Sequence, residues 1–204
     1  KKDIVKTMTS SGTSGQSVSK IFLNKETSSL QIKVLSIIMA DFIGKKRVPM
    51  LVIDTKSIIS NREKITARTA GVLGFSIFGR DVEFALDDDM SINYERVESF
   101  IKKYESENIL IFGFTFVIWK NFVLELEKKG KKLNLYKGTL FHGGGWKKLE
   151  NQSVDTIEFN NRILNNTKIS KVHNYYGMVE QTGSIFVECQ RGFFHTPSFS
   201  DVII

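Results

Sequence analysis

The sequence has one cysteine, Cys189, and only two prolines, Pro49 and Pro197, among 204 residues. A single cysteine excludes an intramolecular disulfide framework and a metal site built from several cysteines, and it fits a reducing compartment. Two prolines leave little punctuation for a second independent domain. With 41% hydrophobic and 25% charged residues, the composition predicts one globular domain with a substantial core.

Long apolar runs are also missing. No stretch reaches the roughly 18 apolar residues that a spanning helix needs, and Lys1-Lys2-Asp3 is not followed by the apolar core of a signal peptide. We therefore expect a cytoplasmic protein with no membrane span.

Acidic side chains are fewer than basic ones, and the formal net charge is +7. Such an excess could indicate a polyanionic partner such as nucleic acid. The lysines, however, are scattered in small groups at expected helix ends, where cations offset the helix dipole and solvate the surface. We therefore expect no nucleic-acid partner. The groups are Lys45-Lys46-Arg47, Lys102-Lys103, Lys128-Lys129, Lys131-Lys132 and Lys147-Lys148.

Strand-like apolar runs alternate with helix-like stretches that are long enough to cross back over a sheet. This order predicts an α/β fold, with a largely parallel sheet flanked by helices. Asn93 can cap a helix, and Gly44 and Gly130 stand where a left-handed helix terminus is wanted. The predicted strands are 19–23, 50–53, 82–86, 109–112, 138–141 and 171–174, and the predicted helices are 28–43, 61–75, 93–105, 116–129 and 154–165.

The pattern changes after Gly177 to short strand-like pieces at 184–188 and 192–196, which predict a hairpin or a small β extension. The chain starts shortly before its most distinctive loop and ends on the apolar tail Asp201-Val202-Ile203-Ile204. We expect residues 1–204 to be the central part of a larger domain that is truncated at both ends.

That distinctive loop, residues 9–17, reads T-S-S-G-T-S-G-Q-S and directly precedes an apolar run. Glycines let the backbone approach a ligand and aim N–H groups at phosphate oxygens, and hydroxyls donate further hydrogen bonds. Composition alone does not separate such a phosphate-binding loop from a flexible Ser/Gly linker. The loop matches neither the Walker A pattern nor the dinucleotide fingerprint.

Ser11-Gly12-Thr13-Ser14-Gly15 resembles the S-G-T-[ST]-G phosphate loop of the adenylate-forming superfamily of acyl and aminoacyl ligases. The resemblance implies that all five residues bind ATP and that Thr13 takes part in catalysis. The superfamily usually has a lysine where this chain has Val18, and Lys20 comes two positions late. The role of that lysine is therefore not carried over.

Asn174-Tyr175-Tyr176-Gly177-Met178-Val179-Glu180 is similar to the Y-G-x-[TV]-E motif of the superfamily, at the end of a predicted strand. The resemblance implies that Tyr176 stacks on adenine, that Gly177 lies in the same site, and that Glu180 is catalytic and holds Mg²⁺. A carboxylate is the hard oxygen ligand that Mg²⁺ prefers. Without the motif, Glu180 would read as an ordinary exposed loop acid.

Phe141-His142-Gly143-Gly144-Gly145-Trp146-Lys147-Lys148 places three glycines after a strand, where open α/β sheets bind ligands. In adenylating enzymes this loop lines the adenine and acyl pocket, so the resemblance implies nucleotide contacts from Gly143, Gly144 and Gly145. His-Gly-Gly-Gly also occurs as the oxyanion loop of lipase-like α/β hydrolases. Such an enzyme needs a G-x-S-x-G elbow downstream, and none follows Gly145.

Together, H-G-G-G-W-K-K and Y-G-M-V-E-Q-T-G resemble the LuxE-type acyl-protein synthetases, or long-chain-fatty-acid luciferin-component ligases, in which valine before the glutamate is normal. Glu188-Cys189 and His195-Thr196-Pro197 also look like this branch. The resemblance implies an enzyme that uses ATP and Mg²⁺ to convert a fatty or related carboxylic acid into an acyl-adenylate. The acyl group then passes to an enzyme cysteine and onward to a reductase partner.

The acyl-accepting cysteine of the family lies beyond Ile204, so we expect Cys189 to be structural. We expect the same of His173 and His195, because nothing in the sequence pairs them into a metal site or a triad. A different class of function stays open, namely a non-catalytic nucleotide-binding or protein-interaction remnant of the same fold.

Overall fold

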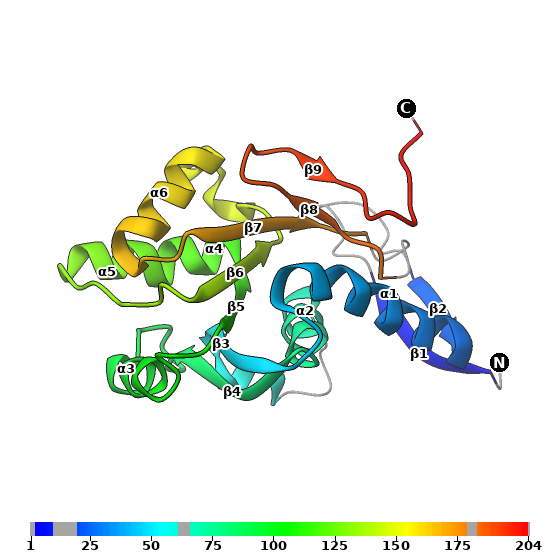
Figure 1. Ribbon diagram of the computed structural model, residues 1–204, viewed down its shortest axis with the longest axis horizontal. Coiled ribbons are helices and arrows are strands. Elements are labelled where there is room, and N and C mark those ends of the chain that lie inside the picture. The colour runs from blue at the N-terminus through cyan, green and yellow to red at the C-terminus, as the bar shows by residue number, and fades with distance from the viewer. Residues whose placement is uncertain (1–2, 10–19, 61–65, 179–182, 204) are drawn as a thin grey trace.

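The fold is built on a seven-stranded sheet with helices on both faces (Figure 1). The computed structural model describes residues 3–9, 20–60, 66–178 and 183–203. The first five strands across the sheet are parallel and the last two are antiparallel. In order across the sheet, the strands are β4 (Gly79–Leu86), β3 (Val48–Thr55), β5 (Ile109–Phe114), β6 (Gly138–Gly143), β7 (Lys171–Tyr176), β8 (Phe186–Glu188) and β9 (Phe194–His195).

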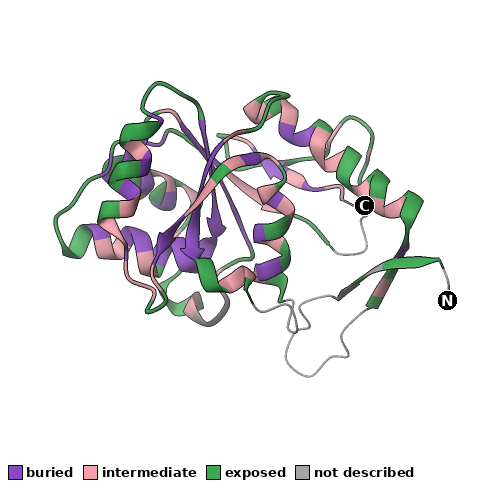
Figure 2. Ribbon diagram, turned by 90° about the horizontal axis from the view of Figure 1, so that it is seen from below, coloured by how far each residue is buried: buried purple, intermediate pink, exposed green. Residues whose placement is uncertain are grey.

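The central strands are apolar because both of their faces are covered. Every residue of β5 and β6 is buried, and in β3 only Val48 is partly exposed. Interior parallel strands accordingly read as nearly continuous apolar runs instead of alternating ones. Figure 2 shows the buried residues concentrated in this sheet, between the two helical layers.

The helices form two layers, one on each face of the sheet, and contacts between aromatic rings join each layer to the sheet. Phe75 stacks on Phe112 of β5 with ring centroids 4.3 Å apart, and on the other face Phe159 lies 4.6 Å from His142 of β6. Within the described ranges, no helix is both long and apolar enough to cross a membrane. One layer holds α1 (Lys25–Ile43) and α2 (Ala67–Ser76), and the other holds α3 (Tyr94–Lys103), α4 (Thr115–Val117), α5 (Leu124–Lys128) and α6 (Thr156–Thr167) (Figure 1).

The predicted α/β architecture is confirmed, and each strand and helix predicted over the described residues is present with boundaries shifted by a few positions. Asn93 caps α3, because its side chain accepts a hydrogen bond from the Arg96 amide at 2.9 Å. Gly44 and Gly130 have φ angles of 80° and 61°, which a residue with a side chain rarely adopts. These boundaries were predictable because local chemistry determines them.

Two features differ from the predictions. β1 (Ile4–Thr9) was not predicted, and it pairs antiparallel with β2 (Lys20–Asn24) in a separate two-stranded sheet. The helix predicted over 116–129 is interrupted by η2 (Ile118–Val123), which is a π-helical segment. The predicted C-terminal hairpin is present as β8 and β9, which extend the main sheet.

A buried ion pair joins α2 to the end of β3. Asp54 has no exposed surface, and the Arg68 Nη2 donates to its Oδ1 at 3.1 Å. Arg68 Nε lies 3.0 Å from Oδ2 without the alignment of a hydrogen bond. Burial raises the pKa of Asp54, while the Thr55 amide and Arg68 oppose that rise. The guanidinium therefore compensates a carboxylate that water does not reach.

We expect Arg68→Gln to lower the free energy of unfolding by about 3 kcal/mol, because it leaves Asp54 buried without a counter-charge. The Asp54 pKa in the folded variant then lies above its unfolded value, so this loss is present at neutral pH and disappears as the pH falls through the folded pKa. Urea unfolding at several pH values measures both effects. Arg80→Gln is the matched control, because the pair of Arg80 with Asp81 is largely exposed, and it should change little. Equal losses in the two variants would contradict the assignment.

Candidate functional site

The carboxyl edge of the parallel strands gathers two of the motifs singled out in the sequence, the glycine loop and the segment that contains Tyr176 and Gly177. Gly143 ends β6 and pairs in register with Tyr175 of β7, which places the glycine loop beside Tyr176 and Gly177. Thr115 follows β5 on the other side of β6. Open α/β sheets bind ligands at this edge. The structure therefore brings together two motifs that are about thirty residues apart in the chain.

The three glycines are required for different reasons. A Cβ on Gly143 would lie 2.8 Å from the Tyr175 ring, and one on Gly144 would lie 2.5 Å from the Phe114 ring. Gly144 and Gly145 also have φ angles of 81° and 64°. Gly143 is buried, whereas Gly144 and Gly145 are exposed, and the space beside Gly145 is open. The loop thus presents bare backbone to a ligand at its second and third glycines.

Thr115 ties the start of this loop to β5. Its hydroxyl donates to the Gly143 carbonyl at 3.1 Å and lies 2.9 Å from the His142 Nδ1. A hydroxyl has one proton, and that proton goes to the carbonyl, so His142 must donate from Nδ1. Burial, and secondarily the charge of His173, lowers the pKa of His142 to about 3. His142 is therefore neutral and carries its proton on Nδ1.

Trp146 holds the other end of the loop. Its ring packs edge-on against Trp119, with centroids 5.3 Å apart, and also meets the edge of Phe159 at 6.1 Å. Trp119 lies within η2. The π-helical segment thus helps to position the ring that follows the third glycine.

Strand alternation separates the roles of the two adjacent tyrosines. Tyr175 points into the core, with its ring 5.1 Å from that of Phe75, and burial raises its pKa to about 12. Tyr176 points the other way and is 49% exposed, and one face of its ring is stacked against Phe186 at 6.3 Å. Phe194 meets the same ring edge-on at 6.5 Å. Tyr176 is therefore a supported aromatic surface that a planar ligand can reach.

The phosphate-loop residues Ser11, Gly12, Thr13, Ser14 and Gly15 lie outside the described residues, as does Glu180. The structure does describe residues that flank these segments in the chain. Thr9, at the end of β1, pairs with Lys20, at the start of β2, and Gly183 is packed so tightly on α1 that a Cβ would lie 2.4 Å from the Gln31 carbonyl oxygen. Nucleotide and metal binding by these six residues stays a prediction.

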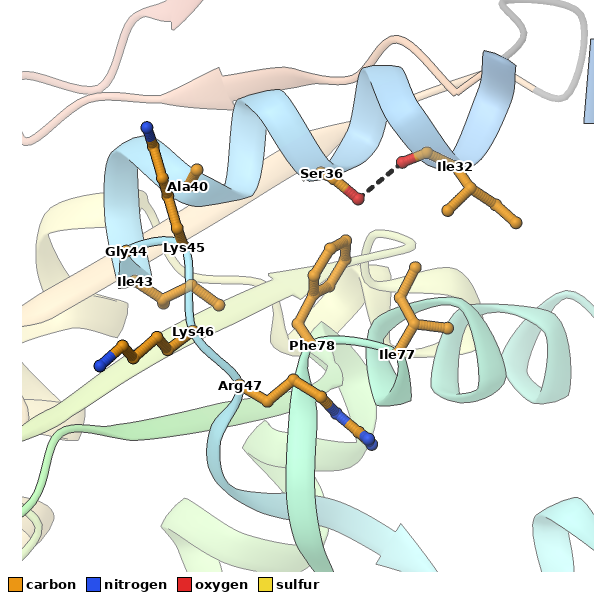
Figure 3. A pocket seen from close by; sticks show the side chains of 10 residues that line it. All are labelled: Ile32, Ser36, Ala40, Ile43, Gly44, Lys45, Lys46, Arg47, Ile77 and Phe78. Carbon is orange, nitrogen blue, oxygen red and sulfur yellow. Dashed lines mark hydrogen bonds between the residues drawn. The ribbon is translucent and has the colours of Figure 1, made fainter. Parts of the chain in front are cut away.

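A cavity of about 250 Å³ lies at the opposite, amino edge of the sheet, between the end of α1 and the turn before β4 (Figure 3). Its walls include Ile43, Phe78 and the three basic residues Lys45, Lys46 and Arg47. The lysine ammonium groups point in different directions and away from the apolar wall (Figure 3). The basic triplet therefore does not converge on an anion, which agrees with its interpretation as solvated surface.

His173 packs as the sequence analysis expected. Its Nδ1 lies 3.2 Å from the Glu188 carbonyl, and its ring packs against Phe42 and Phe141, with burial lowering its pKa. Over the described ranges, no group of three or more His, Cys, Asp or Glu side chains could hold a metal ion. The predicted ligand Glu180 is not among those residues.

Sequence reasoning missed Thr115 as a residue that positions the site. The signal was a threonine placed directly after the buried strand β5, which neighbours β6 in the sheet. We expect Thr115→Val to destabilise the loop by about 1–3 kcal/mol, because the Gly143 carbonyl and the His142 N–H lose their partner. Amide exchange in a peptide spanning Gly143–Trp146 should accelerate in this variant. Thr115→Ser keeps the hydroxyl and should exchange like the wild type; acceleration in both variants would refute the role.

Comparison with solved structures finds the crystal structure of an open conformation of 2-hydroxyisobutyryl-CoA ligase in complex with 2-HIB-AMP and CoA. The TM-score is 0.50 at 12% sequence identity, over 89% of this chain and 37% of that one. At this identity the likeness shows the fold alone, which is that of an adenylate-forming ligase. No curated protein matches the sequence.

Comparison with family models finds a match over residues 1–204 to the family described as acyl-protein synthetase, LuxE. The match includes both motifs at the carboxyl edge and the C-terminal hairpin. The chain therefore belongs to the LuxE acyl-protein synthetase family.

Proposed function

We propose that this protein activates a fatty or related carboxylic acid with ATP and Mg²⁺ as an acyl-adenylate and then transfers the acyl group to a protein thiol. Family membership supports a reaction of this class. The observation that carries the proposal is the pairing of Gly143 with Tyr175, which puts exposed glycine backbone and the supported ring of Tyr176 side by side at the carboxyl edge. The chain spans 37% of the solved ligase, so we propose that residues 1–204 work within a larger AMP-binding domain.

Tyr176 and the glycines suit an adenine nucleotide. The exposed ring of Tyr176 can stack on a base, and the neighbouring ring of Phe186 supports it. Backbone amides at Gly144 and Gly145 can approach the ligand without a Cβ in the way. Ser11, Gly12, Thr13, Ser14 and Gly15 would bind the phosphates, and Glu180 would hold Mg²⁺, which neutralises phosphate charge. The solved ligase holds an adenylate, which is the species that this proposal places here.

The chemistry converts a poor electrophile into a good one. A carboxylate oxygen of the acid attacks the α-phosphorus of ATP, the bond to pyrophosphate breaks, and the acyl-adenylate remains. A thiolate then attacks the acyl carbon and AMP leaves. Catalysis of this kind depends on positioning and on charge neutralisation. Neutral His142 suits such a role, because it fixes the loop without placing a further charge beside the reacting groups.

The substrate and the acceptor are the finer parts of the proposal. The acid is an aliphatic one in this family's reaction, and the final acceptor is a reductase protein that takes the acyl group. ATP is consumed, so we place the reaction in the cytoplasm. A non-catalytic remnant of the same fold would bind an acyl-adenylate analogue without catalysing pyrophosphate exchange.

We expect Glu180→Ala and Thr13→Ala each to slow acid-dependent exchange of pyrophosphate into ATP by at least about tenfold, because each removes a group that stabilises phosphate charge. Glu98→Ala is the matched control, since Glu98 is an exposed acid on α3. It should leave exchange unchanged. Wild-type exchange rates in both Glu180→Ala and Thr13→Ala would contradict the proposed activity.

We expect Tyr176→Ala to weaken binding of ATP and of an acyl-adenylate analogue by about 1–3 kcal/mol, because it removes a stacking surface. Tyr176→Phe keeps the ring and should bind as the wild type does. Tyr136→Ala controls for removal of an exposed tyrosine elsewhere, since Tyr136 is 53% exposed. Isothermal titration measures all four proteins; similar affinities for Tyr176→Ala and Tyr136→Ala would rule out the stacking role.

A further inference from the structure

A second cavity, of about 290 Å³, lies between the C-terminal half of α1 and the β8–β9 hairpin. Its walls are largely apolar, with Ile37 and Phe42 from α1 facing Val187 from β8. The one cysteine of the chain, Cys189, and the imidazole of His195 lie in the same lining. A nucleophile and a proton acceptor thus share an apolar hollow that the proposed nucleotide site does not use.

The hairpin turn shapes the surroundings of the Cys189 sulfur. The chain folds back so that the Cys189 amide donates to the Phe193 carbonyl at 2.9 Å and the Gly192 amide donates to the Cys189 carbonyl at 3.0 Å. The backbone at Phe193 and Arg191 and the side chain of His195 lie close enough to the sulfur to act on its pKa as hydrogen-bond donors. These donors favour the thiolate and lower the pKa of Cys189 to about 7.

Two carboxylates belong to the same neighbourhood. Asp41 faces the cavity from α1, and Glu188 precedes the cysteine on β8. The Glu188 Oε1 accepts a hydrogen bond from the Thr156 hydroxyl at 3.1 Å, which engages it with α6. Cys189 is partly exposed and forms no disulfide, so a reagent in the cavity can reach it.

We propose that Cys189 is a nucleophile that accepts an activated acyl group, whose apolar chain occupies this cavity. The sulfur attacks the acyl carbonyl carbon, a C–S bond forms, and the bond from that carbon to its leaving group breaks. The thiol proton passes to His195. The leaving group is AMP when the donor is an acyl-adenylate and a thiolate when the donor is an acyl thioester. This acceptor differs from the acyl-accepting cysteine that the family resemblance implies.

The hairpin also connects this thiol to the candidate nucleotide site. Phe186 and Phe194, whose rings support Tyr176, lie on the same two short strands as the residues around Cys189. Tyr176 pairs with Phe186 in register, and the two residues on either side of Phe186, Ile185 and Val187, line the cavity. An acyl-adenylate made at the carboxyl edge is one source of the acyl group. Only this source depends on the proposed function, because an acyl thioester needs no ATP.

The first test supplies an activated acyl group without ATP. The purified protein is treated with p-nitrophenyl octanoate or p-nitrophenyl acetate, and the tryptic peptide that ends at Arg191 is followed by mass spectrometry. Octanoylation of Cys189 should exceed acetylation by about tenfold or more, relative to the same ratio for glutathione, because the cavity takes the chain. Ile37→Glu places a charge in the wall and should reduce octanoylation while leaving acetylation unchanged. A rate ratio equal to that of glutathione overturns the proposal.

The second test follows the thiolate. Alkylation of Cys189 by iodoacetamide should rise with pH and be half-maximal near pH 7. In His195→Gln the midpoint should move upward, since the variant loses a donor to the sulfur. An unchanged midpoint in this variant overturns the role of His195.

The third test distinguishes the donors. Octanoate with ATP and Mg²⁺ supplies the adenylate, and octanoyl-CoA without ATP supplies a thioester. Labelling by the first identifies the adenylate as donor, and labelling by the second identifies a thioester. If pyrophosphate exchange fails while octanoyl-CoA labels Cys189, the proposed function fails and the acceptor site stands. If the p-nitrophenyl ester labels Cys189 but neither octanoate with ATP nor octanoyl-CoA does, the proposed role of Cys189 as an acyl acceptor is overturned.

Discussion

The hydroxyl of Thr115 lies at the point where the central sheet becomes the candidate site. The ladder between β5 and β6 ends with the pair Phe114 and Gly143, and Thr115 is the first residue after β5. Its side chain continues the connection by donating to the Gly143 carbonyl and accepting from His142. Because this region is buried between helical layers, each polar group needs a partner within the protein. The first glycine is thereby fixed, and only the second and third remain exposed.

The same burial explains how well the fold follows from the sequence. β3, β5 and β6 are covered on both faces, so their apolar runs could mean little else than interior strands. Asn93, Gly44 and Gly130 mark helix ends through chemistry that acts within a few residues. β1 lacks such a signal, because Ile4 and Val5 are exposed and its pairing partner comes eleven residues after it ends. The π-helical segment depends on packing around Trp119, which local sequence does not encode.

The candidate site divides in a similar way. Its glycine and tyrosine motifs could be read from the sequence, because steric demands restrict those positions: Gly144 needs both a positive φ and room for the Phe114 ring. The partnership of Thr115 with His142 could not be read, since it joins residues 27 positions apart through a strand register. Of two adjacent tyrosines, the structure shows that Tyr176 faces outward, which supports its assignment to the motif.

The C-terminal hairpin is short, and its residues contact both the candidate nucleotide site at Tyr176 and the cavity at Cys189. β8 has three residues and β9 two, and both residues of β9 are exposed. So short a pair of strands at a sheet edge gains little from its own ladder and depends on side-chain contacts for its position. Those contacts are the rings of Phe186 and Phe194 against Tyr176 on one side, and the interactions of His195 with Cys189 on the other. Phe194 and His195 are neighbours in the chain. A group attached to the Cys189 sulfur and a base stacked on Tyr176 would therefore both lie next to side chains of the two-residue strand β9.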